Sequence, residues 1–125
     1  MTDPLRILLV SPDLMVSSRV AALAVQSAAS LDTIHGLESP PPRTGYRVVI
    51  VDLQGLPGDA GDIVRRARER FAPADPAAGP SPAVVAFGPH VAVERLTAAR
   101  DANADEVVSR GELLGGFAGV LGRVG

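Results

Sequence analysis

The stretch Tyr46–Gly58, which reads Tyr-Arg-Val-Val-Ile-Val-Asp-Leu-Gln-Gly-Leu-Pro-Gly, decides the fold. Its four consecutive β-branched residues, Val48–Val51, favour a strand that is buried on both faces, as in a parallel sheet covered by helices. The run ends at Asp52, and a Gly/Pro turn leads to a helical pattern that starts near Asp59. Because open α/β sheets bind ligands at the carboxyl ends of their strands, Asp52 marks a candidate site.

Outside this stretch, short apolar runs alternate with amphipathic helical patterns. Ser11 as N-cap and Pro12 at the first helical position predict the start of the first helix, whose apolar residues recur at helical spacing. The prolines of Ser39–Pro42 limit any helix between the second strand and the central strand to a single turn or none. Further strands are predicted at Leu5–Val10, Leu31–His35, Ala83–Phe87 and Asp105–Ser109, helices at Pro12–Ala28, Asp59–Phe71, His90–Ala102 and Glu112–Val124, and a surface loop at Ala72–Pro82.

This order of elements predicts an α/β fold with a five-stranded parallel sheet, strand order 2-1-3-4-5 and helices on both faces. The second helix is short or absent. A length of 125 residues fits one domain, residues 1–125. In this strand order the turn Ser11–Asp13 and Asp52 should meet at the carboxyl edge of the sheet.

Composition excludes several classes of protein. A hydrophobic content of 46% and a net charge of −2 indicate neither disorder nor a nucleic-acid surface. The chain has no cysteine, which excludes disulfides and thiolate chemistry. The apolar run at the start is too short for a signal peptide or a membrane span, so we expect a soluble cytoplasmic protein with no membrane contact. His35 and His90 have no second ligand at metal-binding spacing, so loop positions explain them.

Three segments together resemble the receiver domains of response regulators, over essentially the whole chain. Val48–Gly58 is similar to the segment that carries the phosphoacceptor aspartate, which places Asp52 at the acceptor position. Ala104–Gly111 is similar to the family's Ala-Asp-Asp-Tyr-Leu-x-Lys-Pro segment, which places Arg110 at the lysine. Counting back from Arg110 without a gap puts Gly88 where the family has threonine or serine.

The departures from that family are as informative as the matches. The two acids expected after the first strand fall on Ser11 and Pro12, and the carboxylate of Asp13 comes one residue late. Mg²⁺ is normally held by one or two carboxylates, and Asp52 alone is a poor site. We therefore predict no bound metal, no cofactor and no enzymatic activity. We also predict that Asp52 meets Arg110 in direct or water-bridged contact, because a guanidinium offers a two-pronged match to a carboxylate.

These observations favour a stand-alone, degenerate receiver-like signalling module that acts through protein partners or self-association, without Mg²⁺-dependent phosphorylation. One alternative is a phosphoaccepting response regulator with Asp52 as nucleophile and Asp13 as its metal partner. The other is a small anion or nucleotide binder. It would use the crevice of Ser11, Asp13, Gly88 and Arg110, with Arg110 as the counter-charge.

The last predicted helix offers a candidate interface. Its apolar stripe should face the sheet, and the opposite side carries Gly115, Gly119 and Gly122. Each interior glycine weakens a helix by about 0.8–1 kcal/mol relative to alanine. A bare glycine face would let another chain approach closely, whereas a frayed terminal helix is the simpler explanation.

Overall fold

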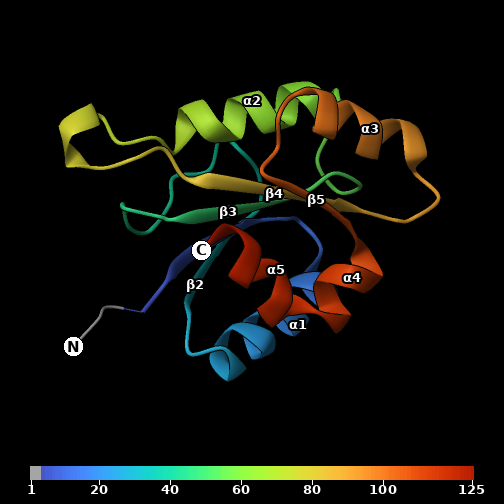
Figure 1. Ribbon diagram of the computed structural model, residues 1–125, viewed down its shortest axis with the longest axis horizontal. Helices are drawn as coiled ribbons and strands as arrows, with labels where there is room; N and C mark the ends of the chain where they lie inside the picture. Colours follow the sequence, from blue (N-terminus) through green and yellow to red (C-terminus); the bar gives the residue numbers. More distant parts are fainter. Residues whose placement is uncertain (1–3) are drawn as a thin grey trace.

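The computed structural model describes residues 4–125 and confirms the predicted sheet. Five parallel strands lie in the order β2-β1-β3-β4-β5 (Figure 1). Their bounds are β1 Arg6–Val10, β2 Ser30–Ile34, β3 Val48–Asp52, β4 Ala83–Gly88 and β5 Glu106–Ser109. Each agrees with its predicted strand to within one residue.

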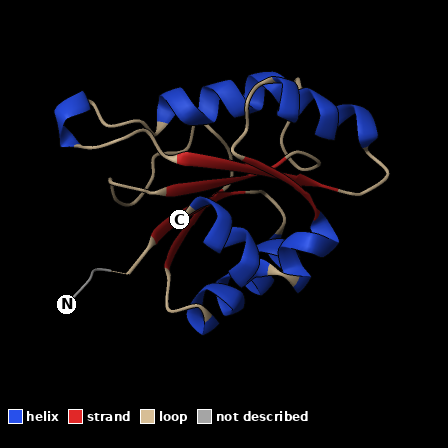
Figure 2. Ribbon diagram, viewed as in Figure 1, coloured by secondary structure: helices blue, strands red, loops and turns tan. Residues whose placement is uncertain are grey.

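Helices cover both faces of this sheet (Figures 1 and 2). One face carries α2 and α3, and the other carries α1, α4 and α5. The helix bounds are α1 Leu14–Gln26, α2 Ala60–Arg70, α3 Val93–Asp101, α4 Arg110–Gly115 and α5 Phe117–Val124. Within residues 4–125, none of the helices is both long and apolar enough to cross a lipid bilayer.

The three central strands bring their carboxyl ends to one edge. The side chains of Val48–Val51 are completely buried, which is why an unbroken apolar run, rather than an alternating one, forms this strand. The register pairs Val10 with Val51 and Asp52 with Phe87. The ends of β1, β3 and β4 therefore lie side by side.

Three helix boundaries differ from the prediction. The first helix begins at Leu14 with Asp13 as its N-cap, whereas the sequence predicted Ser11 as cap and Pro12 as first residue. The predicted Glu112–Val124 helix is divided into α4 and α5 at Gly116, because glycine propagates a helix poorly. The helix expected from His90 starts only at Val93, since Gly88 and Pro89 extend the preceding strand and turn.

The loop predicted at Ala72–Pro82 contains one short 3₁₀ turn, η1 (Pro76–Ala78). In the described chain, no helix lies between β2 and β3, in agreement with the proline content of this segment. The connecting segment instead buries Leu37 and Tyr46 in the same hydrophobic cluster as residues of α2.

A polar network fastens this segment to the edge strand β2. Arg43 donates from Nε to Asp32 Oδ2 at 2.8 Å and from Nη2 to Asp32 Oδ1 at 3.0 Å. The Tyr46 hydroxyl donates to Asp32 Oδ2 at 2.7 Å, and Arg43 Nη2 donates to Ser30 Oγ at 2.7 Å. Ser30 and Asp32 make this face of β2 polar, and residues of the loop hydrogen-bond to both side chains. No apolar helix is therefore needed to cover this face.

The same contacts set the ionisation of the network. The hydrogen bonds from Arg43 keep the pKa of Asp32 below its ordinary value, against the opposing effect of partial burial. Burial, together with the hydrogen bond to Asp32, raises the pKa of Tyr46. An aspartate with a lowered pKa stabilises the fold above its ordinary pKa, and that contribution is lost as the pH falls through the lowered value.

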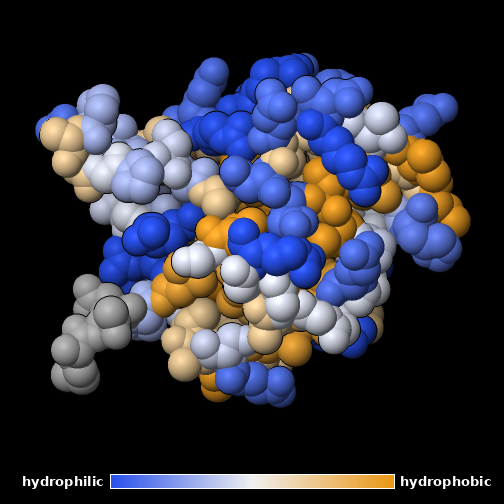
Figure 3. Space-filling model, viewed as in Figure 1, coloured by the Kyte–Doolittle hydropathy of each residue, from blue (hydrophilic) through white to orange (hydrophobic). Residues whose placement is uncertain are grey.

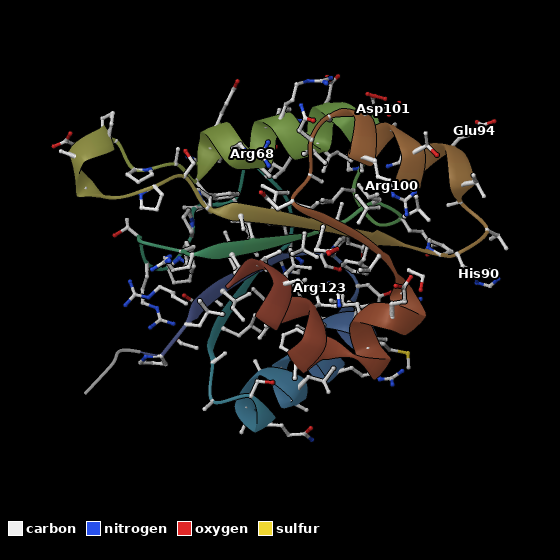
Figure 4. The ribbon with its side chains drawn as sticks, in the orientation of Figure 1. Arg68, His90, Glu94, Arg100, Asp101 and Arg123 are labelled. Carbon is white, nitrogen blue, oxygen red and sulfur yellow. The ribbon has the colours of Figure 1, made fainter. Side chains whose placement is uncertain are left out.

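We therefore predict that Asp32→Asn lowers the free energy of unfolding at neutral pH. The difference from wild type should shrink as the pH falls below 3.8, the ordinary aspartate pKa, and should be lost once the pH is below the lowered pKa of native Asp32, where the wild-type side chain is protonated as well. Urea unfolding across this pH range measures it. The control is Asp101→Asn, since Asp101 is exposed and has no ion pair within the described residues (Figure 4). A difference for Asp32→Asn that stayed constant with pH would contradict the prediction.

Candidate functional site

A crevice of about 220 Å³ lies at the carboxyl edge of the sheet. Asp13, Asp52, Gly88 and Arg110 line it, and they follow or end four different strands. Ser11 is connected to this group by a hydrogen bond from its hydroxyl to Asp52. The structure thus brings together all five residues that the sequence placed in this crevice.

Asp52 is buried and has hydrogen-bond partners on both carboxylate oxygens. Oδ2 accepts a hydrogen bond from Ser11 Oγ at 2.7 Å. Oδ1 accepts from the backbone N–H groups of Gln54 at 3.1 Å and Gly55 at 3.0 Å. The residue is only 3% exposed. This carboxylate therefore organises the turn that follows β3 and ties it to the end of β1.

Gly55 and Pro12 close over Asp52. A Cβ on Gly55 would lie 2.8 Å from Asp52 Oδ2 and 2.8 Å from Pro12 Cδ, which is too close for any side chain. Glycine is required here because the turn approaches the carboxylate and the proline ring directly.

Ser11 acts as a bridge rather than as a helix cap. Its hydroxyl donates to Asp52, and its Oγ accepts a hydrogen bond from the backbone N–H of Asp13 at 3.1 Å. The predicted N-cap role belongs to Asp13, whose Oδ1 accepts from Met15 N at 2.9 Å and Val16 N at 3.2 Å. Aspartate in this position satisfies amide groups that lack partners within the helix.

Arg110 lies within ion-pair distance of Asp13 and makes no direct hydrogen bond or ion pair with Asp52. The direct form of the predicted contact is therefore wrong, and the water-bridged form stays a prediction. The distance from Arg110 Nη2 to Asp13 Oδ2 is 3.9 Å, at the outer limit of an ion pair. A capping box of Ser109 and Glu112 starts α4 and fixes Arg110 as its first residue. The carboxylate of Asp52 already accepts hydrogen bonds from Ser11 and from two backbone amides, so it does not need a guanidinium as a further partner.

Gly88 ends β4 beside this crevice. A Cβ there would meet Leu53 and Leu96 at 3.7 Å, which is ordinary contact, so a side chain would fit. Glycine brings no hydroxyl that could hold an oxygen of a bound group.

The sequence and the fold were compared with those of known proteins. No protein-family model matches the sequence, and no curated protein matches it. Solved structures do match. A response-regulator receiver domain from Bermanella marisrubri superposes with a TM-score of 0.70 at 14% identity, over 98% of both chains. A response regulator from Thermotoga maritima gives the same three values. The orphan response regulator HP1043 of H. pylori gives a TM-score of 0.68 at 16% identity, over 97% of both chains.

This chain has the receiver-domain fold. The likeness extends over nearly the whole chain, as the resemblance of the three sequence segments implied. At these identities the comparison establishes the fold, and the chemistry has to be judged from the residues themselves.

The residues of this receiver fold do not suit a Mg²⁺ ion. Both oxygens of Asp52 are already bonded within the protein, and Asp13 Oδ1 caps α1. Ser11 and Pro12 add no carboxylate. Within residues 4–125, no three His, Cys, Asp or Glu side chains gather closely enough to hold a metal ion. A hard cation that needs several free oxygen ligands is therefore poorly served here.

Sequence reasoning missed one residue that shapes the site. Arg95, on α3, donates from Nε to the carbonyl of Leu53 at 3.0 Å and from Nη1 to the carbonyl of Gly58 at 2.9 Å. Through these carbonyls it holds the turn after β3, and together with Leu56 and Leu96 it lines a cavity of about 450 Å³. Backbone carbonyls as partners leave no mark in the sequence, so only helical spacing could have suggested that Arg95 faces inward.

The glycine face predicted on the last helix is exposed but divided. Gly115 belongs to α4, whereas Gly119 and Gly122 belong to α5, and all three are exposed. The apolar stripe behind them faces the sheet as predicted, with Leu113, Phe117, Val120 and Leu121 buried. Whether another chain docks on this face remains a prediction.

The bond between Ser11 and Asp52 can be measured by a double-mutant cycle. We predict that Ser11→Ala destabilises the fold by about 1–3 kcal/mol, since it leaves a buried carboxylate oxygen without its donor. Asp52→Ala should cost more, because three donors lose their acceptor. The double variant should be more stable than the sum of the two losses implies, by about 0.5–3 kcal/mol of coupling. Urea unfolding measures all four proteins, and strictly additive losses would contradict the bond.

Proposed function

We propose that this protein is a degenerate receiver-like signalling module that works through contact with a protein partner and does not accept a phosphoryl group at Asp52. Receiver-domain structures over nearly the whole chain support the signalling part of this proposal. The burial and hydrogen bonding of Asp52 support the second part, that Asp52 does not accept a phosphoryl group.

Phosphorylation of an aspartate requires a free carboxylate oxygen and neutralisation of the charge that develops on the transferred group. Asp52 is 3% exposed and has three hydrogen-bond donors on its two oxygens. The neighbouring side chains supply neither a metal site nor a hydroxyl at Gly88. Attack through Oδ2 would have to displace the Ser11 hydroxyl, and attack through Oδ1 would have to release the two backbone amides of the turn.

The carboxyl edge of the sheet offers contact surface for a partner. Leu14 and Met15 at the start of α1 are 74% and 72% exposed, and Val91 and Val93 before and at the start of α3 are 73% and 64% exposed. Figure 3 shows hydrophobic atoms at the surface where β4 leads into α3. Among the described residues, one further large apolar side chain is exposed, Val25 near the other end of α1. Exposed apolar residues that gather at one edge, as the other four do, are typical of an interaction site.

Phosphotransfer gives the direct test. We predict that the wild-type protein gains no phosphoryl mass when it is incubated with acetyl phosphate and Mg²⁺, because Asp52 is covered by Ser11, Pro12 and Gly55. Mass spectrometry of the intact protein measures this. Asp52→Asn serves as the matched control.

Two outcomes have different meanings in this experiment. A phosphoryl mass on the wild type that is missing from Asp52→Asn would overturn the proposal and favour a phosphoaccepting regulator. If neither protein gains the mass of a phosphoryl group over its own untreated sample, the result supports the proposal.

The glycine face tests whether contacts include self-association. We predict that Gly115→Ala, Gly119→Ala and Gly122→Ala together raise the free energy of unfolding, because an added Cβ meets nothing closer than 3.9 Å at any of them. Each substitution in a helix contributes about 0.8–1 kcal/mol. Light scattering of the same variant reports association. A more stable protein that associates as before would rule out this face as an interface.

Gly116→Ala is the matched control for the glycine variants. A Cβ on Gly116 would lie 3.2 Å from the carbonyl oxygen of Glu112, at the break between α4 and α5. We expect this substitution to bring no comparable gain in the free energy of unfolding. The control thus shows whether the gain depends on free space for the Cβ within a helix or follows from any glycine-to-alanine change.

A further inference from the structure

A third cavity, of about 480 Å³, shares Pro89 and Arg110 with the crevice. We call it the basic pocket, and it is lined by Arg19 of α1, His90 of the β4–α3 loop and Arg110 of α4, with Pro89 and Leu114 as apolar walls. Figure 4 shows His90 on the loop that follows β4, on the side of the molecule where α4 lies. Three basic side chains from distant parts of the sequence thus converge on one hollow.

The charge of this pocket is unbalanced. None of its lining residues is acidic. Arg19 forms no ion pair with any of the described residues, and the ion pair of Arg110 with Asp13 is 3.9 Å long. By comparison, Arg43, Arg68 and Arg123 each lie 2.8 Å from their carboxylate partners. In a chain with a net charge of −2, a pocket whose positive charge is only weakly compensated favours an anion.

The crevice on the near side of Arg110 is the poorer place for an anion. Two carboxylates, Asp13 and Asp52, line it against a single guanidinium. A negatively charged ligand would be repelled there, whereas no acidic residue lines the basic pocket and the one carboxylate paired with its arginines, Asp13, lies 3.9 Å from Arg110. Of the anion sites that Arg110 can serve, the basic pocket is therefore favoured.

The side chains also indicate which anion. A guanidinium donates two parallel N–H bonds to a phosphoryl group, and arginines are well suited to planar, two-pronged recognition of phosphate. A ring N–H of His90 can add a third direction. The volume is within the range of small-molecule sites, and Pro89 and Leu114 offer apolar contact for an organic group beside the phosphate.

We infer that the basic pocket binds a small phosphomonoester, with its phosphoryl group between Arg19 and Arg110 and its organic group against Pro89 and Leu114. Binding requires no reaction at Asp52, so this site is independent of the proposed lack of phosphorylation.

Phenyl phosphate is the probe for this site. Titration at constant ionic strength, followed by amide NMR shifts of the folded protein, should give saturable changes at residues 90–91 and 110–115. Inorganic phosphate should bind the same residues more weakly, because it lacks the apolar group. Benzyl alcohol, which lacks the phosphoryl group, should leave them unchanged.

Substitutions assign the binding to the pocket. Arg19→Gln and Arg110→Gln should each weaken phenyl phosphate binding about tenfold, the loss expected for one charged hydrogen-bond donor. Arg100→Gln is the matched control, since Arg100 lies on α3 away from the pocket and has no ion pair within the described residues (Figure 4). Asp52→Asn should bind as the wild type does, which keeps this test separate from the test of phosphorylation.

Two results would overturn the inference. One is the absence of saturation by phenyl phosphate at matched ionic strength. The other is a loss of affinity in Arg100→Gln as large as the losses in Arg19→Gln and Arg110→Gln, which would indicate general screening of charge. Because Arg19 is exposed, its substitution leaves the fold intact, and the dispersion of the amide spectrum verifies this in each variant.

Discussion

The hydrogen bond from Ser11 to Asp52 is the contact on which the carboxyl edge of the sheet depends. It joins the end of β1 to the end of β3 across 41 residues of sequence, in a place where both side chains are buried. A buried carboxylate is costly unless it is well paired, and Asp52 has three donors. Its second oxygen orders the turn that carries Gly55, and Arg95 donates hydrogen bonds to backbone carbonyls of the same turn.

This hydrogen bond determines which partners the other charged side chains at the edge have. Asp52 is directed inward as a structural anchor, and Asp13 caps the first helix. Arg110, which the sequence paired with Asp52, is left with a weak partner and stands between the crevice and the basic pocket. At this edge the carboxylates of Asp13 and Asp52 accept hydrogen bonds from within the protein, whereas Arg19 has no ion pair with the described residues and that of Arg110 is long.

The sheet could be predicted from the sequence because its signals are local. The apolar run Val48–Val51 and the alternation of strands and helices give the strand order, and the prolines of Ser39–Pro42 exclude a helix. For the site, the sequence predicted which residues lie near one another but not which of them are bonded. Asp52 and Ser11 were placed at one edge, but their bond competed with the capping role that Ser11 also suits, and Asp13 took that role instead. The network of Asp32, Arg43 and Tyr46 depends on a loop conformation that no periodic pattern encodes.

Linkage between Mg²⁺ and folding tests the central claim most directly, namely that Asp52 is committed to internal hydrogen bonds. A ligand that binds the native state raises the free energy of unfolding in proportion to the logarithm of its concentration above the dissociation constant. The account predicts that millimolar Mg²⁺, compared with Na⁺ at equal ionic strength, leaves the urea unfolding midpoint of the wild type unchanged. A rise in the midpoint that increases with Mg²⁺ concentration and disappears in Asp52→Asn would contradict it.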